Sequence, residues 1–202
     1  MFKPTPYLPD PFMKNDGSRV DTPEAWPDQA AFIRRLAETH YYGTWPGPPS
    51  YVTAALASQS ALFGRAVRET GALTIDGQYP VSVDYLHPSQ GPFPVIVYNA
   101  TRFGMRSCVE KDIVQAGYGI FAFDREMIRP DPSMARGLGY EVPEGPFPSL
   151  PCGDIMAWAW GHAVAADYLR TRKDTEDLIC TGHSRGGKAA LCAGLFDERF
   201  AV

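Results

Sequence analysis

The sequence predicts a single α/β domain in which helices cover both faces of an open, mostly parallel sheet, giving a three-layer sandwich. Two short apolar runs, at residues 93–98 and 118–123, have the unbroken hydrophobicity of strands that are buried on both faces. A third run, at residues 177–181, leads directly into a glycine-rich turn and a segment of small residues. Helix-like segments separate these runs, and such alternation is typical of a parallel α/β sheet.

The first part of the chain, residues 1–70, is expected to form an arm and helices. Residues 1–20 are rich in proline and predict an arm that lies over the core. A helix is predicted from Thr22, which can cap it. Pro23 would occupy the first helical position, and Glu24 would add negative charge to the first turn.

The sheet is expected within residues 71–202, and no repeat or internal boundary divides the chain, so residues 1–202 are interpreted as part of one domain. Asp76 and Gly77 stand between two strand-like segments and predict a hairpin turn. Residues 125–153 form a long stretch laced with Pro and Gly, and a loop of that length is usually functional. The other expected elements are a rigid aromatic loop at 41–49, strands at 72–75 and 79–86, and helices at 107–115, 154–172 and 189–196.

Composition excludes several classes of protein. The 202 residues are 45% hydrophobic and 21% charged, as in a globular domain with a substantial core. A net charge of -4 argues against a nucleic-acid partner. No apolar run approaches the roughly 18 residues of a membrane span, so no membrane partner is expected. The N-terminus shows no signal segment, which predicts a cytoplasmic location for the sequence as written. A secreted or periplasmic one is expected if that start is processed or incomplete.

The four cysteines predict no metal site. Cys108, Cys152, Cys180 and Cys192 include no C-x-x-C pair. Buried free thiols are the favoured interpretation of Cys180 and Cys192. No cofactor is expected.

Residues 182–188, Gly-His-Ser-Arg-Gly-Gly-Lys, indicate nucleophilic attack by a serine. A G-x-S-x-G sequence between a strand and a helix is the nucleophile elbow of the α/β-hydrolase fold. Ser184 would be the nucleophile. The glycines on either side of it would let strand and helix approach closely, and the backbone N–H of Arg185 would face the oxyanion. A second oxyanion donor is expected from residues 99–104, after an earlier strand.

A serine needs a base to take its proton, and no histidine follows Ser184. In this fold class the acid and then the histidine follow the nucleophile along the chain. His183 belongs to the elbow itself, and His162 lies mid-helix, where a packing role is favoured. Asp197 and Glu198 come too early to be the acid. The sequence therefore predicts that the general base is absent and that the domain is truncated after the nucleophile helix.

Residues 182–188 resemble the elbow of the glucuronoyl esterase family, carbohydrate esterase family 15, which reads G-C-S-R-x-G-K. The departure is His183, which replaces a cysteine that forms a disulfide in fungal members, so no such bridge is expected. Residues 189–201, the helical segment 157–161 and the entry segment 8–12 also resemble the family. The resemblance implies that the chain is the N-terminal portion of such a hydrolase, with the acid, the histidine and other sugar contacts beyond residue 202.

The resemblance also implies roles for three residues. Ser184 would attack the ester that joins a glucuronic acid on xylan to a lignin alcohol. The side chain and N–H of Arg185 would hold the oxyanion, and Lys188 would bind hydroxyls of the uronate ring. The expected partner is thus a small or polysaccharide-linked uronate ester, with the fragment inactive alone. Two alternatives stay open: an α/β-hydrolase for acetylated xylan or another small ester, and a carbohydrate-binding remnant without catalysis.

Overall fold

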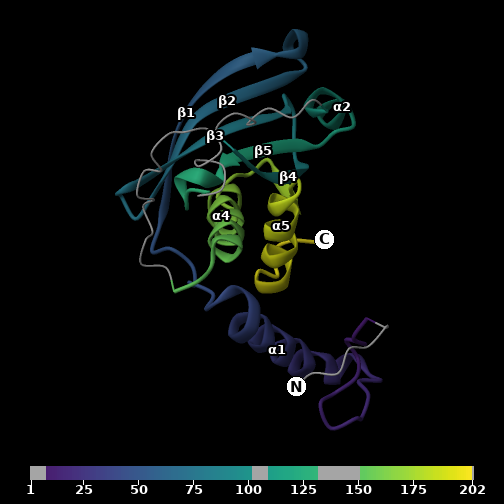
Figure 1. The fold of residues 1–202 in the computed structure, drawn as a ribbon. Helices are drawn as coiled ribbons and strands as arrows, with labels where there is room; N and C mark the ends of the chain where they lie inside the picture. The colour runs from purple at the N-terminus through teal and green to yellow at the C-terminus, as the bar shows by residue number, and fades with distance from the viewer. Residues whose placement is uncertain (1–7, 102–108, 132–150, 202) are drawn as a thin grey trace.

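A computed structural model of the chain describes residues 8–101, 109–131 and 151–201 (Figure 1). The expected helix at 107–115 and the expected loop at 125–153 fall partly outside these ranges. Short 3-10 or π turns are labelled η. The elements, in chain order, are η1 (Pro23–Ala25), α1 (Trp26–Ala37), η2 (Glu38–Tyr42), β1 (Val52–Ala61), η3 (Leu62–Gly64), β2 (Ala66–Ile75), β3 (Tyr79–Pro88), β4 (Phe93–Ala100), α2 (Glu110–Gln115), β5 (Gly119–Asp124), η4 (Arg125–Met127), α4 (Asp154–Leu169), β6 (Thr175–Thr181) and α5 (Arg185–Phe196).

The described strands form one sheet in the order β1-β2-β3-β5-β4-β6. β4 pairs in parallel with both β5 and β6. The pairs β1–β2, β2–β3 and β3–β5 are antiparallel. The α/β prediction is confirmed, but the sheet is mixed rather than mostly parallel. The first three strands are joined by tight connections, and a chain that reverses within a few residues can pair only in the antiparallel sense.

β1 was not predicted, and β2 begins earlier than the expected strand at 72–75. The β1 sequence is mostly small and polar, and most of its residues are exposed, so it lacks the alternation by which strands are found. It is a strand because every residue from Val52 to Ala61 has a partner on β2. The predicted hairpin turn at Asp76 and Gly77 is confirmed, since β2 and β3 pair on either side of it.

The first helix begins in two steps. Pro23 starts a 3-10 turn, and α1 follows from Trp26. Thr22 has the extended backbone of a cap but makes no side-chain capping hydrogen bond, so the predicted cap is wrong in that respect. α4 ends at Leu169, before the expected residue 172.

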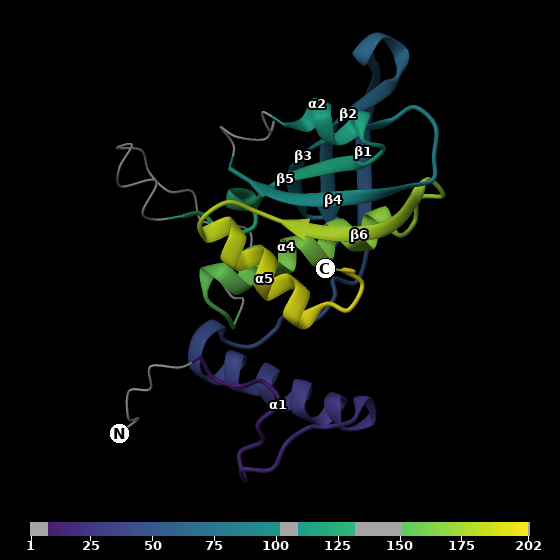
Figure 2. The ribbon, with the colours of Figure 1, turned by 90° about the vertical axis from the view of Figure 1, so that its right-hand side faces the viewer.

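Helices cover both faces of the sheet. α4 and α5 lie side by side on one face, and α2 lies on the other (Figures 1 and 2). Alternate strand residues face opposite layers: Tyr85 and Phe121 belong to the core beneath α4 and α5, whereas Leu86 and Ile120 pack with Val114 of α2. β5 is buried along its whole length, as predicted. β4, predicted to be buried on both faces, is instead half-buried at Pro94, Ile96 and Tyr98. α2 packs mainly on β3 and β5.

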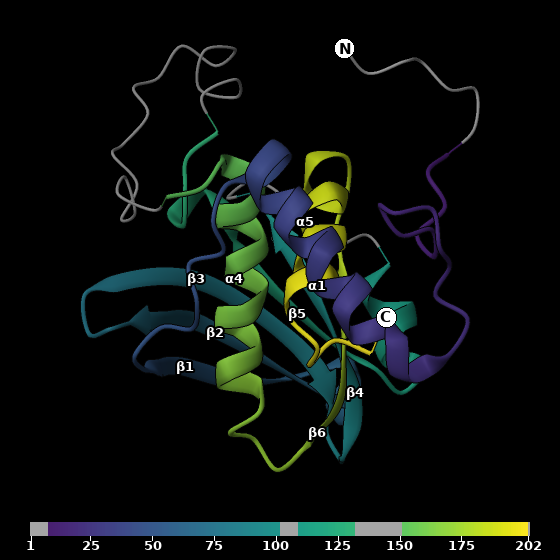
Figure 3. The same ribbon diagram turned by 90° about the horizontal axis from the view of Figure 1, so that it is seen from below.

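α1 forms a further layer outside α4 and α5 (Figure 3). It is fixed at the far end of α5, where the Arg34 side chain donates to the Leu195 carbonyl at 2.7 Å. Trp45, in the expected aromatic loop, stacks on Phe196 with ring centroids 5.3 Å apart. Among the described residues, no helix is long and apolar enough to cross a membrane.

Candidate active site

Ser184 stands on the turn that joins β6 to α5, as the elbow motif predicted. Its backbone has φ +55° and ψ −116°. Residues other than glycine rarely adopt such a conformation, which costs about 1–3 kcal/mol and persists only where the surroundings impose it. The Ser184 side chain is exposed, at the start of α5.

Two glycines impose this turn by letting β6 and α5 nearly touch. A Cβ on Gly182 would lie 2.3 Å from the carbonyl oxygen of Gly186. A Cβ on Gly186 would lie 2.3 Å from Oδ1 of Asn99 and 2.8 Å from Nη1 of Arg125. Neither position can hold a side chain without displacing its neighbours. The predicted reason for glycine at these two positions is confirmed.

Asn99, near the end of β4, contacts the elbow from the buried side. Its side chain is buried, and Nδ2 donates to the carbonyl of Gly186 at 2.8 Å. Oδ1 accepts from Nη1 of Arg125 at 3.2 Å. Because β4 pairs directly with β6, a side chain at the end of β4 can reach across to the first turn of α5.

His162 of α4 lies beneath Asn99 and is fully buried. Its Nε2 is 3.1 Å from Nδ2 of Asn99, and its Nδ1 is 3.3 Å from the carbonyl of Trp158. An imidazole that donates from Nδ1 and accepts at Nε2 satisfies both contacts. Burial lowers the pKa of His162 to about 4, against the opposing effect of the Thr181 and Trp158 carbonyls. His162 is therefore a neutral packing residue, as predicted.

The Arg185 side chain is held by a carboxylate. Its Nη1 lies 2.7 Å from Oδ1 and 2.6 Å from Oδ2 of Asp131. The Asp131 side chain is 2% exposed, whereas that of Arg185 is 38% exposed. The pair thus joins a buried anion to a cation at the surface beside Ser184.

A second arginine lies behind this pair. Arg125, in η4, is buried and places its guanidinium 4.4 Å from the ring centroid of Trp158. Burial lowers the pKa of Arg125, Asp131 raises it and Arg185 lowers it further. The last two effects show that the three charged groups lie close together. The charge of Glu126 also raises the pKa of Arg125, so two arginines and two carboxylates gather beside the elbow.

The three predicted site residues lie together at the N-terminus of α5. Ser184 precedes the helix, Arg185 begins it, and the backbone N–H of Lys188 donates to the Ser184 carbonyl at 3.2 Å. The Lys188 side chain is exposed. The N-terminus of a helix carries partial positive charge, which adds to that of these side chains. Of the expected second oxyanion loop, residues 102–104 lie outside the described ranges.

All four histidines are described, and none contacts the Ser184 hydroxyl. His40 is exposed in η2, and His183 is exposed beside the nucleophile. His87, on β3, has Nε2 4.0 Å from a carboxylate oxygen of Glu69. His162 is engaged beneath the elbow. The four histidines of this chain therefore make no hydrogen bond to Ser184, and the absence of a general base stays a prediction.

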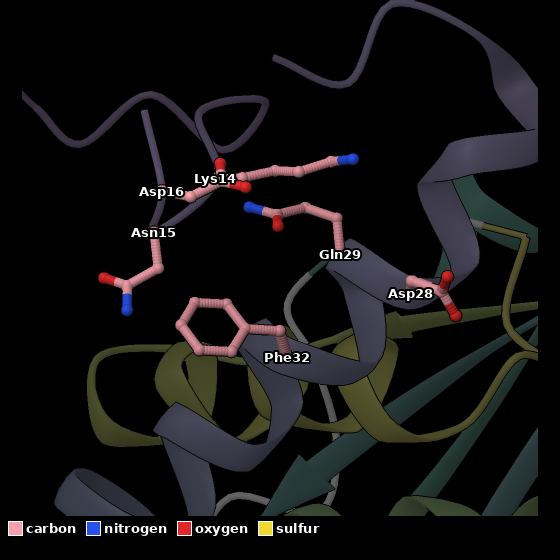
Figure 4. A pocket seen from close by; sticks show the side chains of 6 residues that line it. All are labelled: Lys14, Asn15, Asp16, Asp28, Gln29 and Phe32. Carbon is pink, nitrogen blue, oxygen red and sulfur yellow. The ribbon is translucent and has the colours of Figure 1, made fainter. Parts of the chain in front are cut away.

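A hollow of about 510 Å³ lies elsewhere, between the N-terminal arm and α1 (Figure 4). Lys14 and Asp16 of the arm face Gln29 and Phe32 of the helix across it. Gln29 donates to the carbonyls of Pro11 and Met13, so it holds the arm in place. None of the residues that line this hollow belongs to the elbow.

Sequence reasoning expected Asn99 only as part of a second oxyanion loop, and it missed the contacts that Asn99, Arg125 and Asp131 make at the elbow. Asn99 directly follows an apolar run, and a polar residue at the end of a buried strand could have indicated a contact with the site. Arg125 and Asp131 occur in a stretch interpreted only as a functional loop, with no motif to single them out. No cluster of three or more His, Cys, Asp or Glu side chains within the described ranges could hold a metal ion. Cys152, Cys180 and Cys192 are free thiols. The expected buried free thiol is confirmed for Cys192, whereas Cys180 is only half-buried. Cys108 lies outside the described residues.

Comparison with known proteins identifies relatives. A family described as "Glucuronyl esterase, fungi" matches residues 71–202. A multidomain esterase of Ruminococcus flavefaciens is 28% identical over 210 residues, covering 96% of this chain and 26% of that protein. A 4-O-methyl-glucuronoyl methylesterase of Podospora anserina is 30% identical, covering 96% of this chain and 39% of that protein.

Solved structures agree on the fold. A promiscuous CE15 esterase from a marine bacterial metagenome superposes with a TM-score of 0.76 at 23% identity. The match covers 98% of this chain and 62% of that one. The chain therefore spans well under half the length of the two curated relatives above, and less than two thirds of this structure.

Proposed function

Because this chain belongs to the glucuronoyl esterase family, we propose that it carries the nucleophile and the oxyanion-binding side of a serine carboxylic-ester hydrolase for uronic acid esters. The strained backbone of Ser184 is the observation that carries this proposal. Strain at an exposed serine, imposed by Gly182, Gly186 and Asn99, has no role in packing. It does present a hydroxyl for attack.

In the proposed reaction, Oγ of Ser184 attacks the ester carbonyl carbon and gives up its proton to a base. The carbonyl oxygen becomes an oxyanion, and its collapse expels the alcohol and leaves an acyl-serine ester that water then hydrolyses. Arg185 begins α5 next to Ser184, so its N–H and its guanidinium are both available to the oxyanion. Charged donors of this kind are worth far more in a site that excludes water than in solution.

Lys188 supports a uronate as the acyl group. It is exposed in the first turn of α5, three residues after Arg185. Positive side chains and a helix N-terminus favour a polyhydroxyl or anionic group over an acetyl group. The Podospora anserina relative is named for 4-O-methyl-glucuronoyl methyl esters. The relatives give no support for the acetyl-ester or non-catalytic alternatives over this one.

The test compares hydrolysis of a 4-O-methylglucuronate methyl ester and of acetylated xylan by the protein that its own gene encodes. We expect turnover of the uronate ester, and Ser184→Ala to lower kcat by about a thousandfold or more. Ser58→Ala, at an exposed serine of β1, is the matched control and should leave kcat unchanged. Preference for acetylated xylan would contradict the proposed substrate, and unaltered kcat in Ser184→Ala would contradict the nucleophile.

The 202-residue chain alone is expected to turn over this ester negligibly, because none of its histidines reaches Ser184. Removing triad members typically leaves only about 10³- to 10⁴-fold acceleration over water. Turnover at the rate of a complete serine esterase, lost in Ser184→Ala, would contradict this expectation.

A further inference from the structure

Asp131 is a buried carboxylate whose position is explained by Arg185. Both of its oxygens lie within 2.7 Å of Nη1 of Arg185, and its side chain is almost fully buried. Removing a carboxylate from water is costly unless charged partners replace the water. The contact joins residues 54 positions apart in the chain, so the tertiary fold brings this anion to the elbow.

Arg125 lies near the same carboxylate, whose charge raises the pKa of Arg125. It is held over Trp158 and donates to Asn99, the residue that also binds the carbonyl of Gly186. Arg125 is thereby connected, through Asn99, to the backbone of the elbow itself.

The Arg185 side chain needs such a partner. A long arginine side chain at the surface samples many rotamers, and a donor stabilises a transition state only when it is already in place. One guanidinium nitrogen, Nη1, faces both oxygens of the Asp131 carboxylate, and a charge-assisted contact of this kind favours one orientation of the side chain. A buried carboxylate with Arg125 behind it is a fixed anchor for one of those orientations.

We propose that Asp131 is a positioning residue, which, supported by Arg125, holds the Arg185 guanidinium beside the Ser184 hydroxyl. This inference rests on the proposed function, in which Arg185 stabilises the oxyanion. Asp131 is not expected to touch the substrate. Its loss should therefore lower kcat and leave KM for the uronate ester unchanged.

The experiment uses the protein that its own gene encodes, with a 4-O-methylglucuronate methyl ester as substrate. Asp131→Asn keeps the shape of the side chain but removes its charge, and kcat should fall by about tenfold to a hundredfold, as for a misplaced catalytic group. Asp177→Asn, at an exposed position of β6, is the matched control and should behave as wild type. Arg185→Gln should also lower kcat, and the double variant should be no slower than Arg185→Gln alone.

Losses that multiply in the double variant, or an Asp131→Asn variant with wild-type kcat, would overturn the inference while leaving the nucleophile assignment intact. If Asp131→Asn does not fold, Asp131→Glu decides. It keeps the charge but moves the carboxylate by one methylene, so wild-type kcat in that variant would also overturn the inference.

A second readout does not depend on esterase activity. Phenylglyoxal modifies accessible arginines, and mass spectrometry of the peptide that contains Arg185 follows its rate of modification. Modification of Arg185 should be several-fold faster in Asp131→Asn than in wild type or in Asp177→Asn. If Ser184→Ala retains full activity, the proposed function fails. The rate of phenylglyoxal modification of Arg185 still decides whether Asp131 holds that side chain. Equal modification rates in wild type, Asp131→Asn and Asp177→Asn would refute the contact.

Discussion

Acid should destabilise this fold through His162, the histidine buried beneath the elbow. Its pKa is about 4 in the folded state because burial disfavours the charged imidazole. An unfolded histidine titrates near 6.5, so between these values the unfolded chain binds more protons than the folded one. The stability that neutral His162 contributes is therefore complete above about pH 7 and is lost as the pH falls through 6.5 towards 4.

The two pKa values set the size of the effect. From the linkage relation, this histidine alone should lower the free energy of unfolding by about 2 kcal/mol at pH 5 relative to pH 8. Protonation would also place an N–H of His162 against Nδ2 of Asn99, which is 3.1 Å away and donates to Gly186. Acid should therefore loosen the elbow as well as the core.

The assay is urea unfolding at pH 8, 7, 6 and 5, for wild type and for His162→Gln. Glutamine is neutral throughout and can accept from Asn99, so the variant should lose less stability on acidification, by about 2 kcal/mol. His40→Gln, at an exposed histidine, is the control and should follow wild type. Parallel curves for wild type and His162→Gln would refute the reasoning. If His162→Gln does not fold, NMR titration of His162 in the wild-type protein replaces this comparison. A titration midpoint near pH 6.5 would also refute the reasoning.

Three further predictions concern the elbow and the thiols. Gly186→Ala should lower the free energy of unfolding by about 1–3 kcal/mol or more, because its Cβ has no room. Gly194→Ala in the same helix meets nothing closer than Cys180 Sγ at 3.7 Å and should gain up to about 1 kcal/mol; equal urea midpoints would contradict this. Ser184→Gly should raise stability by about 1 kcal/mol by relieving the positive φ, whereas a lower melting temperature would indicate no strain there. Burial raises the pKa of Cys192 to about 12, so iodoacetamide at pH 8 should label half-buried Cys152 before Cys192. Equal labelling rates at these two thiols would count against the burial of Cys192.

The elbow could be predicted from the sequence because its physics is local. A strained serine between a strand and a helix needs small residues on either side, and Gly182 and Gly186 satisfy this within five positions of the chain. Motif and conformation therefore occupy the same short segment. The hairpin at Asp76 and Gly77 was predictable for the same reason.

The sheet was harder to predict than its strands. Apolar runs indicate where strands form, but the sense of each pair depends on how the chain returns. β1 shows the limit, because its small and polar residues give no pattern and it exists through backbone pairing with β2. The pattern of strands and helices favoured a parallel sheet, whereas the structure has a mixed one.

The sequence by itself determined the segment in which Ser184, Arg185 and Lys188 stand together, and with it the reaction class that we propose. The tertiary structure decided what holds them. Asn99 contacts Gly186 from 87 positions away, and Asp131 meets Arg185 across 54. Such contacts follow no periodicity along the chain. They exist because β4, η4 and α4 converge beneath α5, where burial makes each charge and each amide depend on a partner that only the folded chain brings close.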